Sequence, residues 1–445
     1  MQAKRRVVVT GLGVASPIGL GVEAFWDALL RKRCGLRRIE AFDPSGFSTQ
    51  IGGELPPFQL GDHIPKTYRK SAKVMSRDIR IAVVCAYYAV KDAGLNTRCL
   101  VQRGEAEQTN LDSPRFGANI GAGLVCTDLG ELTAALSTAA QDDGTFSLRL
   151  WGTEGMSNLA PLWLLKSLPN MLACHVTIVH DAQGPSNTIT CGEASSHLAV
   201  GEAYRTIARG DADVCICGGA ESKMNPLALS RPQLLGRLNT QDNETPERSC
   251  RPFAQDRRGM IAAEGGGLAI LESLDHARAR RARIYAELIG FGASSNTQGW
   301  ADPCPRGLDV ALALRNALND AGITADQIDL AAPFGAATQD HDASELAGWN
   351  DVLGGRLDDI PALTTRGATG NNGAGSGAID FAATVLALHR STVPPSLNTA
   401  PADPVSRFRF VQDDPVDARI DRAISFGMAL SGGQRAALVL RRFEE

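Results

Sequence analysis

Short apolar runs alternate along this chain with longer stretches in which apolar residues recur every three or four positions. The short runs predict strands, and the periodic stretches predict helices. Strands are predicted at residues 6–10, 115–122, 177–179, 188–190, 214–218, 267–271, 286–294, 330–333, 423–426 and 436–441. Helices are predicted at residues 22–30, 78–93, 194–209, 310–320, 343–352 and 375–389. This alternation indicates an α/β protein.

One helical pattern occurs twice along the chain. Residues 79–94 end in Asp92-Ala93-Gly94, and residues 310–322 end in Asp320-Ala321-Gly322. An acidic connection and another strand follow each pattern. The repeated order predicts two similar α/β halves.

Composition and charge argue against a nucleic-acid-binding or membrane protein. The 445 residues allow one large or two fused α/β units, and the formal net charge of −4 gives no electrostatic case for binding nucleic acid or an anionic membrane. No apolar stretch approaches a transmembrane length. Ten cysteines at scattered spacings, with no signal peptide before Val7, lead us to expect reduced thiols in a cytoplasm.

Three motifs resemble cofactor or metal sites only weakly. Cys215 and Cys217 fall on one face of a predicted strand without a second pair at zinc spacing, so we expect them to pack in the core. The Gly11-x-Gly13 run lacks the third glycine of a dinucleotide fingerprint. His341 lies between two aspartates and is interpreted as a solvated loop residue. We expect neither a cofactor nor a metal.

The segment from Gly184 to Ser196 carries the candidate chemistry. A β-type run at residues 188–190 leads into a sharp turn, and a helix is predicted to follow from Ala194. A side chain at such a turn faces backbone N–H groups and the positive end of the helix dipole, where an enzyme holds a thiolate or an oxyanion. Glu193 stands at this elbow.

Six blocks of the chain, in order, resemble the β-ketoacyl synthase (ketosynthase) family of condensing enzymes. The blocks are residues 6–19, 118–123, 184–186, 210–221, 251–265 and 425–427. The resemblance covers nearly the whole chain and implies a thiolase-type five-layered αβαβα sandwich. It places the boundary between the two halves near residue 265, dividing the chain into residues 1–265 and 266–445.

The family's catalytic residues are missing from the matching positions. Counting seven positions on from Ser186 and eight back from Gly201 reaches Glu193 both times, where the family has its nucleophilic cysteine. Cys191 is two residues too early, although it stays open as a displaced nucleophile or as a buried thiol in the substrate pocket.

The family's two histidines are also absent. Phe334 stands at the first histidine position, Asn371 at the second, and Arg366 replaces the family's lysine. In active relatives the histidines donate hydrogen bonds that stabilise the enolate formed by malonyl decarboxylation, and Phe334 can donate none. Two states of Glu193 stay open: a protonated Glu193 would hydrogen-bond much as the glutamine of chain-length factors does, and an ionised Glu193 would be held by the helix N-terminus, Asn371 or Arg366.

The resemblance also implies a substrate pocket and a docking site. Met428 follows Ser425-Phe426-Gly427 where the family usually places a gating phenylalanine, so Met428 and Phe426 are expected at the pocket. The family meets its acyl carrier protein through basic residues near residues 66–80. The candidate docking residues are Lys66, Arg69, Lys70 and Lys73, and the alternative is a solvated helical face.

These substitutions resemble those of chain-length-factor subunits, which pair with an active ketosynthase in type II polyketide or related synthesis. We therefore expect a chain that is inactive alone, forms a heterodimer and helps to shape the acyl tunnel. Three alternatives stay open. They are an enzyme with rewired chemistry that uses Glu193 or Cys191, a malonyl decarboxylase, and a non-catalytic homodimer that binds acyl groups.

Overall fold

The main strands follow the same order twice in one mixed sheet of the computed structural model, which describes residues 4–444. In the first half, β6, β5 and β7 are parallel, and β8 and β1 follow antiparallel. In the second half, β11, β10 and β15 are parallel, and β16 and β9 follow antiparallel. The halves meet where Val7–Val9 of β1 pairs with Ala286–Leu288 of β9.

The bounds of these strands are as follows. The first half uses β1 (Val7–Ser16), β5 (Phe116–Ala122), β6 (Ser186–Ile189), β7 (Val214–Ser222) and β8 (Glu264–Ser273). The second half uses β9 (Ala286–Ser295), β10 (Leu330–Ala332), β11 (Pro361–Ala362), β15 (Arg422–Met428) and β16 (Gln434–Arg441). Short strands complete the set: β2 (Gly19–Leu20), β3 (Leu36–Arg38), β4 (Ile51–Gly53), β12 (Thr392–Val393), β13 (Arg409–Phe410) and β14 (Val416–Asp417).

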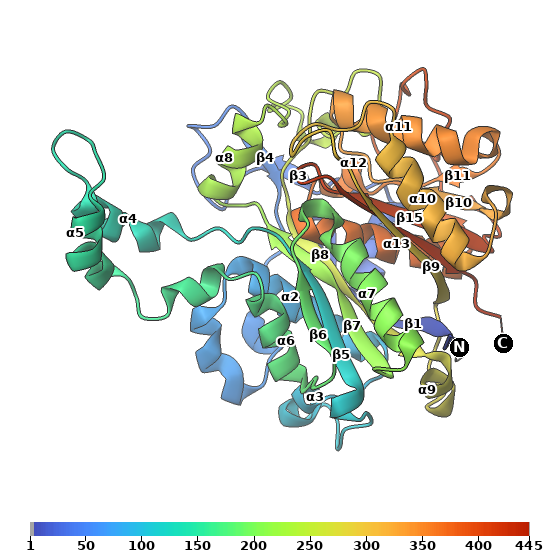
Figure 1. Cartoon of the computed structure of the whole chain (residues 1–445), viewed down its shortest axis with the longest axis horizontal. Coiled ribbons are helices and arrows are strands. Elements are labelled where there is room, and N and C mark those ends of the chain that lie inside the picture. Colours follow the sequence, from blue (N-terminus) through green and yellow to red (C-terminus); the bar gives the residue numbers. More distant parts are fainter. Residues whose placement is uncertain (1–3, 445) are drawn as a thin grey trace.

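Helices form three layers around the two halves of the sheet (Figure 1). The central layer contains α7 (Ser195–Arg209) and α13 (Ser376–Arg390). One outer layer contains α2 (Arg77–Asp92) and α6 (Met171–His180), and the other contains α10 (Leu308–Ala321) and α11 (Gln339–Leu353). The predicted five-layered αβαβα sandwich is therefore confirmed.

Further helices lie outside these layers. They are α1 (Val22–Leu30), α3 (Arg98–Arg103), α4 (Leu129–Ala139), α5 (Leu148–Thr153), α8 (Pro226–Leu234), α9 (Leu274–Ala279) and α12 (Arg366–Thr369). No helix within residues 4–444 is both long and apolar enough to cross a membrane.

The repeated Asp-Ala-Gly pattern has one structural role in both halves. Asp92 at the end of α2 accepts a hydrogen bond from the Leu12 backbone N–H of β1 at 2.8 Å, and Asp320 near the end of α10 accepts one from the Phe291 N–H of β9 at 3.0 Å. Each pattern then ends at a left-handed glycine, as is common after a helix. The prediction of two similar halves is confirmed at residue level.

The predicted boundary at residues 265 and 266 falls inside β8. That strand pairs with β1 and β7 of the first half, and the repeated strand order starts again at β9. A division between β8 and β9 fits the repeat better, and two halves as separate units stay a proposal.

The glycines after the first strand pattern serve packing. A Cβ at Gly13 would lie 2.1 Å from the Cys85 carbonyl oxygen of α2, and one at Gly11 would lie 2.4 Å from the Ala89 carbonyl oxygen. Both glycines lie within β1 and let α2 approach the sheet closely. Their spacing is thus explained by helix–sheet contact.

One predicted strand is wrong. Residues 177–179 belong to α6, in which Leu172, Val176 and Val179 bury one helical face against the outer side of the sheet. Three β-branched residues in a row indicated a strand, but the spacing of the buried residues over the whole segment is helical.

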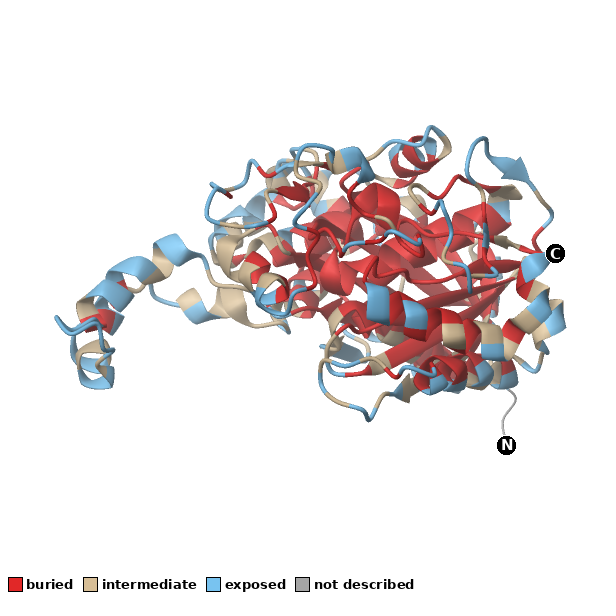
Figure 2. Ribbon diagram, turned by 90° about the horizontal axis from the view of Figure 1, so that it is seen from above, coloured by how far each residue is buried: buried red, intermediate tan, exposed pale blue. Residues whose placement is uncertain are grey.

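An arm of residues 124–168 leaves the body of the protein, and its helices were not predicted. It contains α4 and α5, and Figure 1 shows it extending well beyond the sheet. Figure 2 shows that most of it is exposed or only partly buried. Its exposed apolar side chains are Leu124, Leu129, Leu136, Phe146, Leu148, Met156, Leu162 and Leu164. Such a concentration is unusual for a surface that meets only water.

Candidate functional site

The predicted elbow is a tight turn between β6 and α7. Residues Gly192–Ala194 form a single 3-10 turn directly before α7, and Gly192 has a φ of 53°, in the left-handed region that glycine adopts readily. The Cys191 N–H donates to Ser195 Oγ at 2.8 Å, and Ser195 Oγ donates to the Gly192 carbonyl at 2.7 Å. This small ring fixes Glu193 at the start of the buried helix.

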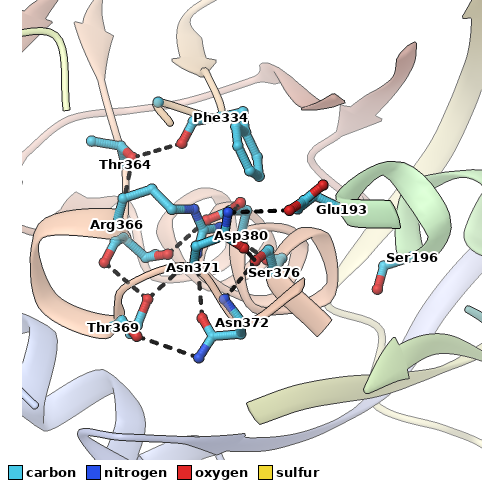
Figure 3. A network of polar contacts seen from close by, with 12 residues as sticks. Glu193, Ser196, Phe334, Thr364, Arg366, Thr369, Asn371, Asn372, Ser376 and Asp380 are labelled. Carbon is cyan, nitrogen blue, oxygen red and sulfur yellow. Dashed lines mark hydrogen bonds and ion pairs between the residues drawn. The ribbon is translucent and has the colours of Figure 1, made fainter. Parts of the chain in front are cut away.

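The Glu193 carboxylate is buried, with 7 % of the residue exposed, and each of its oxygens accepts a hydrogen bond. Asn371 Nδ2 donates to Oε1 at 3.2 Å, as Figure 3 shows, and the Leu430 backbone N–H donates to Oε2 at 3.1 Å. Of the predicted holders, Asn371 contacts the carboxylate and Arg366 does not. Leu430 was missed because it acts through its backbone, which leaves no signal in the sequence.

Electrostatics keep Glu193 ionised at neutral pH. Burial alone would raise the pKa of Glu193, but the charge of Lys223 and the hydrogen bonds from Leu430 and Asn371 outweigh burial and hold the pKa below its ordinary value. A carboxylate with a lowered pKa and occupied lone pairs is a poor general base.

A second elbow faces the first. Residues Gly373–Gly375 form a 3-10 turn before α13, Gly373 has a φ of 56°, and the Asn372 N–H donates to Ser376 Oγ at 2.9 Å. The 3-10 turn, the left-handed glycine and the backbone N–H bond to the serine hydroxyl thus recur in the second half, whereas the Ser376 hydroxyl contacts Asn371 Oδ1 at 3.4 Å and not the glycine carbonyl. Ala374 occupies the place that corresponds to Glu193.

Glu221 and Lys223 bring further charge to these elbows. Both lie at the end of β7 or directly after it. Glu221 Oε2 accepts a hydrogen bond from the Ala374 N–H at 2.6 Å, and its Oε1 pairs with Lys223 Nζ at 3.0 Å. The charges of Glu221 and Glu193 raise the pKa of Lys223 against the opposing effect of its burial, which is the largest single influence. Lys223 was missed, although a lysine that directly follows a buried strand is an available signal.

Phe334 lies just beyond β10 with its side chain fully buried. Its backbone N–H donates to Glu345 Oε1 at 2.7 Å, and its ring lies 5.0 Å from the guanidinium of Arg366. The ring supplies no hydrogen-bond donor, so the residue predicted at the family's first histidine position offers no side-chain donor.

Arg366 is part of a buried network, and the bonds drawn from it in Figure 3 go to groups other than Glu193. It forms an ion pair with Asp380 and donates to the carbonyl oxygens of Gly370 and Ser376 at 3.0 Å each. These contacts join α12 to the first turns of α13. The contacts of Arg366 are therefore those of a residue that stabilises the second elbow.

Cys191 lies two residues beyond the end of β6, so it belongs to the turn and not to the strand. It starts the turn because its N–H is committed to Ser195. Its thiol is partly exposed, and burial raises its pKa above the ordinary value. The thiol therefore stays protonated at neutral pH, which disfavours it as a nucleophile.

Phe426 and Met428 are both completely buried in the hydrophobic cluster that also contains Phe334 and Leu430. Phe426 packs edge-on against Trp349 with ring centroids 6.1 Å apart. Their part in a substrate pocket stays a prediction.

The prediction of a solvated His341 is wrong. The residue is helical and buried in α11, and its Nε2 lies 3.2 Å from the Leu430 carbonyl oxygen. Its Nδ1 lies 3.1 Å from both Thr338 Oγ1 and Asp340 Oδ1. The two flanking aspartates suggested exposure, but only Asp340 faces solvent, and Asp342 is buried. His341 thus fixes the carbonyl of the same residue whose N–H contacts Glu193.

Cys215 and Cys217 pack in the central hydrophobic cluster, as predicted. Within the described residues, no group of three or more His, Cys, Asp or Glu side chains is arranged to hold a metal ion.

The basic segment lies on the surface. Lys66, Arg69, Lys70 and Lys73 are exposed on a 3-10 helix of residues 66–74, and none of them forms an ion pair with another residue in the range 4–444. Arg77 differs because it pairs with Glu264 at 2.6 Å. The segment therefore presents free positive charge, whichever of the two predicted roles it has.

Comparison with known proteins agrees with this geometry. Residues 4–277 match the family model described as beta-ketoacyl synthase, N-terminal domain, and residues 285–400 match the model of the C-terminal domain. A 3-oxoacyl-(acyl-carrier-protein) synthase 2 from Vibrio cholerae serotype O1 is 31 % identical, with 99 % of this chain and 100 % of the relative covered.

Two solved structures cover 99 % of this chain and 100 % of their own, each with a TM-score of 0.82. One, described as the ishigamide ketosynthase/chain length factor, is 28 % identical. The other, 26 % identical, is described as a type II polyketide synthase acyl carrier protein in complex with its ketosynthase bound to the hexaketide.

Proposed function

This chain belongs to the β-ketoacyl synthase family, and from that premise we propose that it is a non-catalytic subunit, similar to a chain-length factor, that pairs with an active ketosynthase. One observation carries the proposal. The Glu193 carboxylate is buried at the elbow where the family has its nucleophile, and it accepts hydrogen bonds from Asn371 and Leu430.

The chemistry of condensation supports this reading. Carbon–carbon bond formation in this family needs a thiolate that takes the acyl chain and donors that stabilise an enolate. The elbow offers a carboxylate, Phe334 offers no donor, and the Asn371 amide is committed to Glu193. The nearest thiol, Cys191, has a raised pKa. These facts also disfavour a rewired acyltransferase or a malonyl decarboxylase.

Two surfaces support a partner subunit. The arm of residues 124–168 carries eight exposed apolar side chains, and such a concentration on a surface is typical of a protein–protein contact. The edge of the sheet ends at β6, whose first residues are exposed and whose outer backbone groups have no neighbouring strand among residues 4–444. A second subunit of the same fold would cover both features, and the ishigamide relative is described as a ketosynthase with a chain length factor.

The basic segment supports a second partner, an acyl carrier protein. Four cations on residues 66–74 without ion pairs would attract an acidic protein and mainly raise its rate of association. A neighbouring structure holds a ketosynthase together with an acyl carrier protein. In this proposal the chain adds charge to the docking surface and one wall to the acyl tunnel.

Co-expression with an intact ketosynthase tests the proposal. We expect a stable 1:1 complex, condensation only when the partner's cysteine is intact, and no acyl adduct on this chain by mass spectrometry. A homodimer indifferent to ketosynthases would contradict the pairing, and an adduct on Cys191 would contradict the inactivity.

A further inference from the structure

The Glu193 carboxylate is held by two hydrogen-bond donors, one on each oxygen. Asn371 Nδ2 and the Leu430 N–H donate to its two oxygens, and Glu193 itself lies in the 3-10 turn that directly precedes the 15-residue helix α7. Lys223 directly follows β7 and pairs with Glu221 beside Gly373 of the second elbow. It supplies a positive charge to the site. These are the features of an anion-binding site.

The donors are held in place by contacts of their own. The Gly373 N–H donates to Asn371 Oδ1 at 2.9 Å, which fixes the amide so that its Nδ2 faces Glu193. The Leu430 carbonyl lies 3.2 Å from His341 Nε2, and Arg237 Nη1 donates to the hydroxyl of the next residue, Ser431, at 2.8 Å. Because these supports do not involve Glu193, the donors stay directed inward when its side chain is shortened.

We propose that these groups form a carboxylate-binding site whose resident ligand is the chain's own Glu193, and that a free two-carbon carboxylate takes the vacated place when that side chain is shortened. The site is selective for a carboxylate because Asn371, Leu430 and Lys223 present donors and positive charge but no free acceptor toward it. A neutral amide of the same shape would place its NH2 group against a donor.

This inference concerns what the elbow binds, and it shares only the position of Glu193 with the proposed function. It implies that a substrate carboxylate, such as that of a malonyl group, is excluded from the elbow because the chain fills that position itself. Its test uses the purified chain without a partner. A failed test would therefore leave the proposed pairing with a ketosynthase unaffected.

Glu193→Ala provides the test because acetate has the same heavy atoms as the fragment that the substitution removes. A ligand that binds only the folded state multiplies the folding equilibrium constant by one plus the ratio of its concentration to Kd, about elevenfold at ten times Kd. We expect acetate to raise the unfolding midpoint of E193A in a saturable way. Acetamide and methylammonium at the same concentration should not, with ionic strength held constant by chloride.

Glu202→Ala is the matched control, since Glu202 lies on the same helix with a partly exposed side chain. Acetate should leave the midpoints of E202A and of the unaltered chain unchanged relative to chloride. Equal effects of acetate and acetamide on E193A, or equal effects of acetate on E193A and E202A, would overturn the proposal.

If E193A does not fold in either salt, the test is a double-mutant cycle that compares Glu193→Gln, Lys223→Met and the variant that combines both. Gln preserves the shape of Glu but not its charge, so we expect E193Q to lower the folding equilibrium constant much less when Lys223 is already Met. A combined effect within twofold of the product of the single effects would show that Lys223 does not belong to the site.

Discussion

Asn371 donates a hydrogen bond from its side-chain amide to the Glu193 carboxylate across 3.2 Å, and this contact joins the two halves of the chain at the positions predicted to match the family's cysteine and second histidine. In an active condensing enzyme these positions hold a nucleophilic thiolate and a group that donates a hydrogen bond to the enolate. Here the Asn371 amide and the Glu193 carboxylate hydrogen-bond to each other, so neither group is free for such a role. The scaffold is retained, but its reactive groups are satisfied internally.

Glu193→Cys restores the nucleophile alone, and we expect it to leave condensation close to background. Phe334 and Asn371 would still deny the enolate the donors that it needs, and loss of one such donor costs about 100- to 1,000-fold in rate. Condensation with acyl- and malonyl-loaded carrier protein measures this. The same variant with Phe334→His and Asn371→His added is the comparison, and an E193C rate equal to that of the triple variant would mean that the two histidine positions are irrelevant.

The stability of the chain should depend on Glu193 in acid. Since its folded-state pKa lies below its ordinary value of 4.5, the folded state binds this proton less tightly than the unfolded state does. The stabilisation is complete above pH 4.5 and is lost as the pH falls through the folded-state pKa, at up to about 1.4 kcal/mol per pH unit. We expect the difference in unfolding free energy between the unaltered chain and E193Q to shrink below pH 4.5. A difference that stays constant from pH 7 to pH 3.5 would contradict a lowered pKa for Glu193 in the folded state.

Arg366→Met should destabilise the fold strongly. Asp380 would lose its partner at a site with no access to water, and breaking a buried pair by removing one member costs about 3–5 kcal/mol. Urea unfolding measures the change. Arg419→Met is the control because Arg419 pairs with Asp421 on the surface, where such a loss costs less than about 1 kcal/mol. Similar values for the two variants would show that the Arg366 pair contributes no more than a surface contact.

Leu148→Asp should weaken assembly without affecting the fold. Leu148 is 79 % exposed on the arm, so a charge there costs the free chain little but would be buried in a subunit interface. The measurement is co-purification with an active ketosynthase together with the unfolding midpoint. Leu312→Asp serves as the control, since Leu312 is 49 % exposed on α10, which Figure 1 shows far from the arm. Equal yields of complex for both variants would remove the arm from the interface.

Reversing the charge at Lys70 and Lys73 should slow the association with acyl carrier protein. We expect about a tenfold or greater loss of association rate at low salt, and the difference from the unaltered chain should fade as salt is raised. Stopped-flow or surface binding measures the rates. Arg278→Glu with Arg281→Glu is the matched control, because both arginines are exposed near α9 and form no ion pair with other residues in the range 4–444. The same loss in both double variants would indicate a general effect of net charge.

Much of the fold could be predicted because local pattern and tertiary structure agree. Helix α1 and the elbow at Glu193 lie where periodicity and turn residues placed them, and the Asp-Ala-Gly repeat predicted the duplicated halves. Prediction failed where burial depends on distant residues. His341 is buried because the loop that contains Leu430 packs over it, and residues 177–179 are helical because Leu172 and Val176 share their buried face. The position of Lys223 directly after a buried strand could have marked it as a candidate, but sequence spacing does not reveal that its charge acts on Glu193.

The two elbows show what the duplication made possible. Gly192, Glu193 and Ser195 in one half correspond to Gly373, Ala374 and Ser376 in the other, and in both turns the serine hydroxyl accepts a hydrogen bond from the residue before the glycine. Equal turns that carry an acid on one side and a methyl group on the other break the pseudo-twofold symmetry of the core. Because Ala374 carries no charge, Glu193 meets no second carboxylate at the equivalent position of the other half, and the repulsion that would raise the pKa of such a pair does not arise.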